Sequence, residues 1–484
     1  MTAPAGASTT TTETTTMHTR TSTFTSMRGL AGAALLGAAL ALPAARLAAQ
    51  GAAPAGASER PAVITFEEAL RIALRQNGAV RQAQNANDLD AATVRQQKLQ
   101  LLPDLRLATS GAQSLGRNFN EAEGRIVDQT TQSLSAGLSS SVTLFDGLAN
   151  VANLKGAQLA EEASTRDLTR TRQTVAFTVA SNYLALVTQQ EQLRVQEENM
   201  AAQVALEGQI QRFVDAGARP VSDLYQQQAA VAGARAAVVA ARRALELAKV
   251  DVIQTLQLDP RGTYEFAPPT LADSADTGER YALDSLLTRA FADRVDLDAQ
   301  ASRVAAAEQG VRAATASRWP TVSLNAGYNS AFTSATDLAF VDQLDQRRGG
   351  SVGLSVSLPL FDRGSTAVAA QRARIEADNA RLTLESRRQE VALQVRRAYL
   401  DHDAAREQLA ASEAQQRASD LAVRTTQERY RVGASTLVEL TQARASQVEA
   451  ASAVVSARYN LVFQRAVMTY YTGELDPARL ALGD

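Results

Sequence analysis

Residues 133–147 read Ser-Leu-Ser-Ala-Gly-Leu-Ser-Ser-Ser-Val-Thr-Leu-Phe-Asp-Gly, and residues 351–362 read Ser-Val-Gly-Leu-Ser-Val-Ser-Leu-Pro-Leu-Phe-Asp. In both stretches apolar side chains fall mainly on every second residue, with serine, glycine or threonine between them. This period of two predicts β-strands with one apolar and one polar face, over about 132–146 and 350–362. Half of a soluble sandwich would carry the same alternation. The lengths, however, also suit tilted strands of about 9 to 11 residues that cross a bilayer.

The two stretches belong to an internal repeat, and a repeat constrains the whole architecture. Pro103 recurs as Pro320 and Gly217 recurs as Gly433, so the spacing is 216 or 217 residues. The predicted divisions are a signal peptide with its leader at 1–49, an N-terminal tail at 50–64, a first repeat at 65–259, an equatorial linker at 260–280, a second repeat at 281–473 and a C-terminal tail at 474–484. The expected elements are strands at about 103–115, 132–146, 320–330 and 350–362, polar loops at 116–130 and 330–349, and long helices at about 147–213, 219–259, 364–430 and 435–472.

Long helices follow the second strand of each copy, because these segments contain no proline and almost no glycine. At 1.5 Å per residue, roughly 65 residues extend about 100 Å, comparable with the depth of the periplasm. Gly217 and Gly433 suit helix ends, and residues 436–439 form a capping box that opens the returning helix. Shorter helical pieces precede the strands, with breaks near Asn77 and Asp293.

Composition excludes several classes of function. Lys and Arg (49) almost balance Asp and Glu (51), so nothing favours nucleic acid as a partner. The chain has no cysteine, and its only histidines are His18 and His402, so we expect no disulfide, no metal or cofactor site and no enzymatic activity. We interpret the sequence around His402, Asp401-His402-Asp403, as a solvated stretch of helix. A nucleotide-binding G-x-x-x-x-G-K-[ST] loop is also absent from the sequence.

The N-terminus predicts export. Met27 and Arg28 precede an apolar run over 30–42, and small residues continue to Ala49. This is typical of a secretory signal peptide, cleaved after Ala44 or Ala49. The apolar run is shorter than the roughly 20 residues of a membrane-spanning helix, which disfavours the alternative of an uncleaved anchor.

Four membrane strands require further copies of the chain, because lipid offers no hydrogen-bond partner to an open sheet edge. The smallest membrane barrels have about eight strands. A dimer with eight strands and a trimer with twelve are both possible. The small residues on the polar strand faces favour an open lumen, and therefore the trimer.

These motifs and their order resemble the TolC-type outer-membrane efflux proteins, the outer membrane factors, over nearly the whole mature chain. The resemblance is carried by the repeat, by Leu-Phe-Asp-Gly at 144–147, by Arg-Tyr-Arg-Val-Gly at 429–433 and by Leu-Val-Glu-Leu at 437–440. It implies an α+β membrane protein, a homotrimer whose twelve-stranded β-barrel, four strands per chain, continues into a long periplasmic α-helical barrel of coiled-coil hairpins. It further implies a passive duct in the outer membrane of a Gram-negative-type cell. That duct would export small molecules and drugs with a periplasmic adaptor (membrane fusion protein) and an inner-membrane pump.

The resemblance also assigns roles to the hairpin tips. The adaptor would dock on eight tip residues: Ala216, Gly217, Ala218, Arg219, Val432, Gly433, Ala434 and Ser435. The lumen would narrow at four positions: Tyr430, Asp223, Glu439 and Gln442. A family example carries an aspartate at the position of Gln442 and an arginine at that of Ser435. The constriction is therefore expected to be less charged here, and a tyrosine–arginine tether is disfavoured.

Structural roles remain open for the same residues. The tip glycines would end helices, Glu439 would complete a capping box, and Asp223 would complement a helix N-terminus. Phe145 and Phe361, where strands meet helices, would anchor at the lipid interface or simply pack. The outlet of a type I protein secretion system would look the same as a drug-efflux duct. A structural coiled-coil protein or an adaptor is disfavoured by the two hairpins and paired strands.

Overall fold

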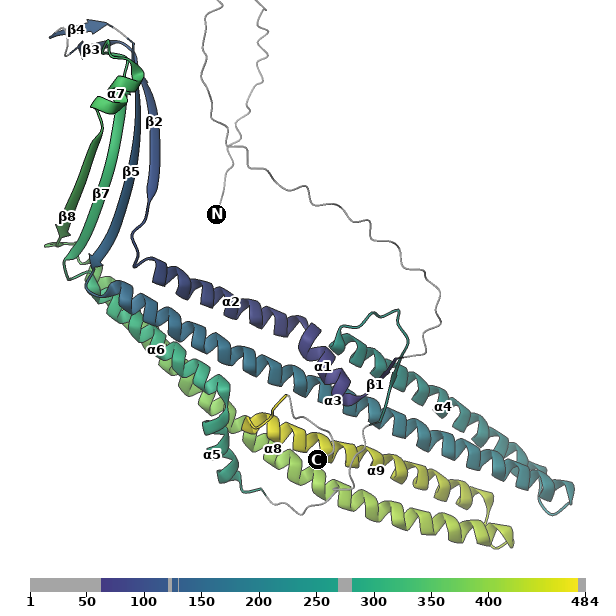
Figure 1. Ribbon diagram of the computed structural model, residues 1–484. Helices are drawn as coiled ribbons and strands as arrows, with labels where there is room; N and C mark the ends of the chain where they lie inside the picture. Colours follow the sequence, from purple (N-terminus) through teal and green to yellow (C-terminus); the bar gives the residue numbers. More distant parts are fainter. Residues whose placement is uncertain (1–61, 121–123, 129, 269–280, 478–484) are drawn as a thin grey trace, which may run out of the picture. The chain divides into compact units, whose positions relative to one another are not determined.

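The computed structural model describes residues 62–120, 124–128, 130–268 and 281–477 (Figure 1). The expected signal peptide at 1–49 lies outside the described residues, as do most of the tail at 50–64, residues 269–280 of the linker and the end of the C-terminal tail. Within the described ranges, no helix combines the length and the apolar character that a membrane span requires.

One antiparallel sheet unites the strand pairs of the two copies, in the order β2-β5-β7-β8. Its strands are β2 (Arg106–Ser114), β5 (Thr131–Phe145), β7 (Thr321–Thr333) and β8 (Gly349–Ser357). The pairing of β5 with β7 joins the two repeats of the chain, with Leu138 opposite Tyr328. The last strand was expected to reach residue 362 but ends at Ser357, because Pro359 has no N–H to donate to a ladder.

The first copy supplies helices α1 (Phe66–Gln76), α2 (Gly78–Leu99), α3 (Ala149–Asp215) and α4 (Val221–Leu256). The second supplies α5 (Leu283–Asp293), α6 (Val295–Ala316), α8 (Ser365–Arg431) and α9 (Leu437–Thr472). α3 and α8 each run for 67 residues. The break between α1 and α2 is capped by Asn77, whose Oδ1 accepts a 2.9 Å hydrogen bond from the Ala79 N–H. The expected class of long helices with some sheet is confirmed.

The helices pack side by side as a wall with two open edges. In the half that adjoins the strands, α2 contacts α3, α3 contacts α6 and α6 contacts α8. In the hairpin half, α4 contacts α3, α3 contacts α9 and α9 contacts α8. One edge of the wall is therefore made of α2 and α4, and the other is α8.

Four segments that the sequence assigned to a tail, a linker or loops contain regular structure. In the tail and the linker, β1 (Ala62–Ile64) pairs in parallel with β6 (Tyr264–Phe266), and the Tyr183 hydroxyl donates to the Ile64 carbonyl at 3.2 Å. In the expected loop at 116–130, β3 (Arg117–Asn120) pairs with β4 (Arg125–Asp128). The expected loop at 330–349 contains helix α7 (Phe340–Gln346). The two expected loops were wrongly interpreted as lacking secondary structure.

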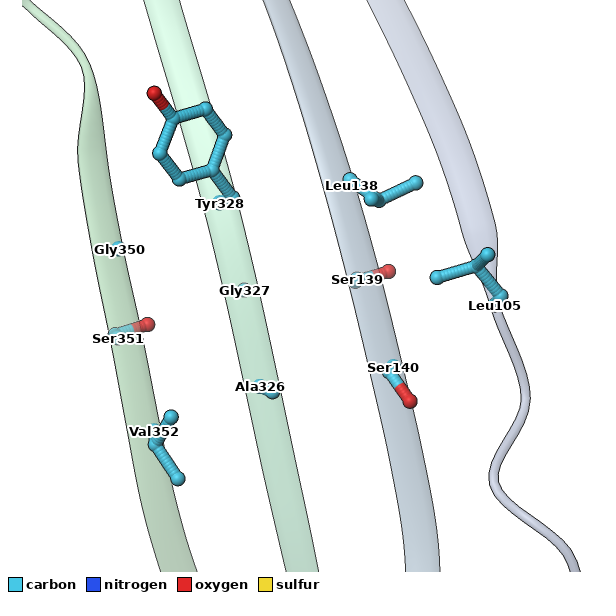
Figure 2. Close-up of a pocket in the computed structure, with 10 residues that line it drawn as sticks. All are labelled: Leu105, Leu138, Ser139, Ser140, Ala326, Gly327, Tyr328, Gly350, Ser351 and Val352. Carbon is cyan, nitrogen blue, oxygen red and sulfur yellow. The ribbon is translucent and has the colours of Figure 1, made fainter.

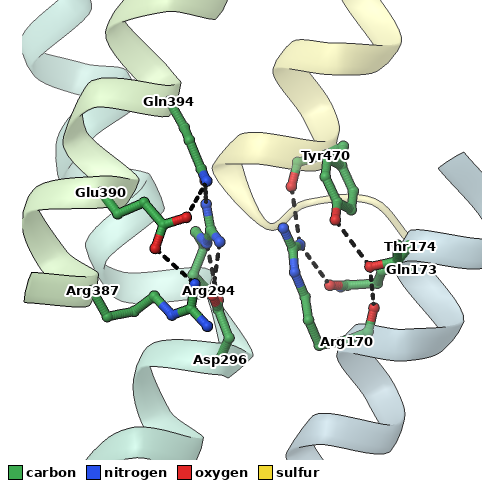
Figure 3. Close-up of polar contacts among 9 residues, drawn as sticks. All are labelled: Arg170, Gln173, Thr174, Arg294, Asp296, Arg387, Glu390, Gln394 and Tyr470. Carbon is green, nitrogen blue, oxygen red and sulfur yellow. Dashed lines mark hydrogen bonds and ion pairs between the residues drawn. The ribbon is translucent and has the colours of Figure 1, made fainter. Parts of the chain in front are cut away.

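A buried polar cluster ties the second copy together at the break between α5 and α6 (Figure 3). Arg294 donates from Nε and Nη2 to the Asp296 carboxylate at 2.9 and 2.7 Å, and from Nη1 to Gln394 Oε1 at 2.7 Å. Burial acts to raise the pKa of Asp296, but the hydrogen bond and charge of Arg294 outweigh it and hold that pKa below its ordinary value. Nearby, Arg170 donates to the Tyr470 carbonyl at 3.2 Å and lies 4.0 Å from the centroid of its ring.

Candidate functional site

One face of the four-stranded sheet is apolar and exposed in the isolated chain. Leu138 stands between Leu107 and Tyr328 on this face, and Leu324 stands opposite Leu354. All five side chains are exposed. An apolar sheet face of this extent is unfavourable in water unless another surface or lipid covers it.

The opposite face carries small hydroxyl and amide side chains. Ser110 and Ser135 share a 2.7 Å hydrogen bond across β2 and β5, and Asn325 donates to Ser355 at 3.1 Å across β7 and β8. Within β2, β5, β7 and β8, the only charged residue is Arg106 at the start of β2, which pairs with Asp104 at 2.8 Å. The sheet is therefore apolar on one side and neutral and hydrophilic on the other.

A hollow interrupts the apolar face where small residues replace large ones (Figure 2). Ser140, Ala326 and Gly350 lie in it, with Leu138 and Tyr328 beside them. The hollow introduces no charged group into the apolar face.

Exposed apolar side chains also gather where the strands meet the helices. They occur at each of the four junctions: Leu102 and Leu105, Leu144 and Leu148, Trp319, and Leu358, Leu360 and Phe361. The two phenylalanines of the repeat differ, since Phe361 is 86% exposed whereas Phe145 is half-buried. A belt of apolar and aromatic residues at this level is typical of a membrane–water interface.

The Phe-Asp motif at two of these junctions turns the chain from strand into helix. Asp146 accepts a 2.8 Å hydrogen bond from the Asn150 N–H, and Asp362 accepts one of 2.8 Å from the Thr366 N–H. The bonds from Thr366 hold the pKa of Asp362 well below its usual range. Each aspartate thus caps the start of a 67-residue helix, α3 or α8.

At the other end of the helices, the expected constriction residues Tyr430 and Asp223 come together. The Tyr430 hydroxyl donates to Asp223 Oδ2 at 3.3 Å, and the tyrosine is only 1% exposed. Leucines and isoleucine of both hairpins surround it: Leu206, Ile210, Leu224, Leu437 and Leu440. Burial, followed by the charge of Asp223, raises the pKa of Tyr430. The two hairpins of one chain are therefore joined at their tips.

Arg219, expected as an adaptor-docking residue, reinforces this junction through a contact with Tyr430 that the sequence did not predict. Its Nη2 donates to the Tyr430 carbonyl at 2.6 Å, and its guanidinium lies 4.5 Å from the centroid of the tyrosine ring. A tyrosine–arginine contact was disfavoured because Ser435 stands where the family example has arginine. The structure shows a tyrosine–arginine contact of a different kind, because the first hairpin provides Arg219 beside Tyr430.

The remaining tip residues divide into exposed and inward-facing groups. Glu439 accepts from the Ser435 hydroxyl at 2.5 Å, while its N–H donates to Thr436 Oγ1 at 3.2 Å, so it has a structural role at the start of α9. Ser435 is buried and Arg219 is half-buried. The constriction candidate Gln442 and six tip residues are exposed: Ala216, Gly217, Ala218, Val432, Gly433 and Ala434. Only the exposed tip residues are accessible to a partner in this conformation.

His402 is not solvated, contrary to the interpretation from sequence. It is buried on α8, with its ring 5.2 Å from the Tyr281 ring in an edge-to-face arrangement. Burial, Arg465 and Arg406 lower the pKa of His402. Across the described ranges, no group of three His, Cys, Asp or Glu side chains is placed to hold a metal ion.

Comparisons with known proteins point to one family. The sequence model described as outer membrane efflux protein matches residues 69–256 and 286–474. Outer membrane efflux protein BepC of Brucella suis is 23% identical over 350 residues, covering 72% of this chain and 74% of BepC. Pyoverdine export outer membrane protein OpmQ of Pseudomonas putida is 23% identical over 387 residues, covering 76% of this chain and 78% of OpmQ. The crystal structure of VceC from Vibrio cholerae has the same fold, with a TM-score of 0.73, 18% identity, and coverage of 84% of this chain and 96% of VceC.

Proposed function

The chain belongs to the outer membrane efflux protein family, and from this premise we propose that three copies form a passive duct for the export of small molecules and drugs. Membership places the protein in the outer membrane, extending into the periplasm. The observation that carries the proposal is a sheet with an exposed apolar face, a neutral polar face and two open edges. In a membrane the apolar face meets lipid and the polar face lines water.

The sheet edges require partners. No described strand pairs with the outer side of β2 or β8. Their backbone groups would remain unsatisfied in lipid, where each costs several kcal/mol. Pairing β8 of one copy with β2 of the next satisfies both edges and repeats until the ring closes.

The helical wall offers a second surface for the same contact. α8 buries Val391, Val395 and Ala398 against its own chain. Roughly half a turn around the helix, a second row of apolar side chains is exposed: Val368, Ile375, Leu382, Leu393, Leu400 and Leu421. We call this row the α8 edge stripe. A helix that is apolar on two opposite sides needs two partners, and its own chain supplies one.

The opposite edge of the wall carries matching side chains. On α4, Tyr225, Val239 and Val250 are exposed, and on α2, Leu89 is exposed. Packing α8 against α2 and α4 of the next copy covers both edges. Because β8 leads into α8 and α2 leads into β2, one rotation closes the sheet and the wall together.

Three copies fit this ring best. Two would give eight strands, whose interior is filled by side chains. Three give twelve strands, and the small residues of the polar face leave the interior open.

The energy for export comes from a partner, because the chain has no nucleotide-binding loop. We assign an inner-membrane pump and a periplasmic adaptor to this role. The exposed tip residues around Gly217 and Gly433 form the adaptor's docking surface. The relative OpmQ is a pyoverdine export protein, which supports a small molecule as cargo.

The junction of Tyr430, Asp223 and Arg219 is the proposed gate, with Glu439 and Gln442 beside it. It holds the tips of the two hairpins together, so it must loosen if the hairpins separate. In a ring of three chains, carboxylates at this level face one another across the axis. Their mutual repulsion favours opening, and a bound cation screens it.

Trp319 provides the test of the duct, since it is the only tryptophan in the sequence and is 62% exposed at the α6–β7 junction. In vesicles of brominated lipid we expect quenching of its fluorescence, strongest with bromines near the head group. Electron microscopy of detergent-purified protein should give a three-fold hollow particle. Unquenched, water-like emission together with a compact monomer would rule out the duct.

A further inference from the structure

The β3–β4 hairpin presents an apolar surface that the described parts of its own chain do not cover. Phe119 and Ile126 stand opposite each other across the two strands, and both are 63% exposed. The pair continues the register of β2 with β5, so it is the end of that hairpin, and among the described residues no third strand lies beside it. A two-stranded end is marginally stable in water unless something packs against it, and the described parts of the chain supply no such cover.

Helix α7 is a rigid platform on the connection between β7 and β8. Gln343, fully buried, accepts from the Thr333 N–H at 2.9 Å and donates to the Leu338 carbonyl at 2.8 Å. The Ser330 hydroxyl donates to the Leu344 carbonyl at 2.7 Å. These bonds fix α7 to the end of β7, so whatever α7 presents outward has a defined position.

The outward side of this platform is apolar and also carries exposed carboxylates. Leu338, Phe340 and Val341 are all exposed. Asp342 beside them is exposed and has no ion pair with any described residue. On the hairpin, Arg117 lies on the same face as Phe119 and likewise has no such ion pair. The two surfaces match in their apolar groups, and Arg117, which stands opposite Asp128 across the hairpin, carries the charge opposite to that of Asp342.

The strand order determines which α7 meets the hairpin. The hairpin connects β2 to β5 and α7 connects β7 to β8, so both lie at the same end of the sheet (Figure 1). Within one chain they are two strand spacings apart, about 10 Å. If β8 pairs with the next copy's β2, the next copy's hairpin is equally far from this α7. The chain's own α7 leaves Phe119 and Ile126 exposed, and the neighbour's α7 is the surface within reach in the proposed ring that matches them.

We propose that the apolar face of the β3–β4 hairpin packs on α7 of the adjacent copy, a contact that we call the rim clasp. It rests on the proposed function, because it requires the ring. Each copy contributes a hairpin to one neighbour and an α7 to the other. The clasp joins the copies at the end of the sheet farthest from the long helices, beyond the pairing of β8 with β2.

The absence of cysteine from the sequence makes disulfide trapping a clean test. Phe119→Cys and Val341→Cys are placed in separate chains, which are co-expressed, oxidised and separated without reductant. We expect disulfide-linked pairs of chains. The double variant in a single chain should give linked species of two and three chains. If the double variant formed an internal disulfide and no linked chains, the clasp would be overturned.

A matched control excludes random collisions between exposed cysteines. Val63 on β1 is about as exposed as Phe119, at 60%, but lies in the helical half of the chain. Phe119→Cys with Val63→Cys should remain unlinked, and equal linking would overturn the inference. The number of copies in each sample is counted by microscopy. A three-fold ring without linkage overturns the clasp alone, whereas a monomer overturns the proposed function and the clasp with it.

Discussion

Gly147, in the turn between β5 and α3, occupies a position that tolerates no side chain. Its φ is +70°, and a Cβ there would lie 2.5 Å from the Ala316 carbonyl oxygen. Gly364, in the matching turn before α8, has φ +78° but nothing within 4 Å of a Cβ. Alanine costs about 1–2 kcal/mol for the left-handed conformation at either site, and only at Gly147 does it also collide with backbone. We expect Gly147→Ala to lower the melting temperature clearly more than Gly364→Ala. Equal shifts in circular-dichroism melts would contradict this.

Arg219 should hold the gate closed through its shape as well as its charge. Its guanidinium stacks on Tyr430 and bonds the tyrosine carbonyl, whereas lysine keeps only the charge. A cation–π contact of this kind is worth roughly 0.5–2 kcal/mol. We therefore expect Arg219→Gln and Arg219→Lys both to raise the open fraction in bilayer recordings several-fold. Tyr430→Phe, which loses only the 3.3 Å bond to Asp223, should have a smaller effect. If the open fraction of Arg219→Lys equalled that of the unmodified protein, the charge alone would suffice.

His402 gives the protein a sensitivity to acid. It faces Tyr281 before α5, Arg465 on α9, and Arg406 and Asp403 on α8. Because burial and the arginines lower the pKa of His402 from 6.5, the unfolded chain binds a proton at a pH where the native chain does not. Native stability should therefore fall as the pH drops below about 6.5, and His402→Gln should remove part of that dependence. Urea unfolding at about pH 7.5 and 5.5 measures the difference, and parallel losses in both proteins would exclude His402 as the cause.

For single residues, the sequence identifies motifs better than it identifies which side chains contact one another. The repeat located the tip glycines, because they recur at a fixed spacing, and the family resemblance located Tyr430. It did not reveal Arg219 as a partner of Tyr430, since the contact joins residues 211 positions apart in different hairpins. For His402, the flanking aspartates suggested solvent. Adjacent residues on a helix point in different directions, however, so exposure of Asp401 is compatible with burial of His402.

The α8 edge stripe makes the corresponding prediction for an element. Leu393 and Leu400 are exposed in the isolated chain, so replacing both with serine should leave the fold of that chain nearly unchanged. In the proposed ring they would be buried, and each Leu→Ser change would remove apolar contact worth on the order of 1–2 kcal/mol. Leu393→Ser with Leu400→Ser should therefore shift the protein towards monomers in detergent, with helix content retained. The control is Arg388→Ser, an exposed position on α8 that lies about a third of a turn around the helix from Leu393 and Leu400. If the double variant still formed intact trimers, the α8 edge stripe would not be part of the interface between chains.

Elements long enough to show a period are predictable, and short ones are not. The alternation at 133–145 and the proline-free run after it predicted β5 and α3, whose period extends over many residues. β1 and β6 have three residues each, which is too few to reveal any alternation. α7 is a helix of seven residues held by the buried Gln343, a polar side chain that in sequence favours a loop. Tertiary contacts, which composition does not report, determine these segments.

At the scale of the whole molecule, the sheet and the helical wall each have two uncovered edges. The edges of the sheet and of the wall lie on the same two sides of the chain. The sheet needs backbone hydrogen bonds at β2 and β8, and the helical wall needs apolar cover at α2, α4 and α8. Because each strand edge is continuous in sequence with the helix edge beside it, a copy that satisfies one is positioned to satisfy the other. Such a contact joins two different surfaces, so it generates a closed ring when the rotation between copies divides a full turn. In the proposed ring the rotation would also decide how closely the tips, with the proposed gate residues, approach the axis.

The charge of the gate is therefore a property of the ring, and one chain cannot report it. Asp223 contributes a carboxylate bonded to Tyr430, and Glu439 one bonded to Ser435. In a ring of three, six carboxylates would share a narrow opening, attract cations and repel anions. Asp223→Asn with Glu439→Gln preserves hydrogen-bond acceptors while removing the charge. We expect this double variant to lose cation selectivity and cation block, measured as the reversal potential and the current in a salt gradient. Asp215→Asn, at the exposed end of α3, supplies a control that changes charge near the tip without touching the junction. If the control and the double variant shift the reversal potential equally, a diffuse negative tip sets the selectivity, and the assignment of Asp223 and Glu439 as a gate fails.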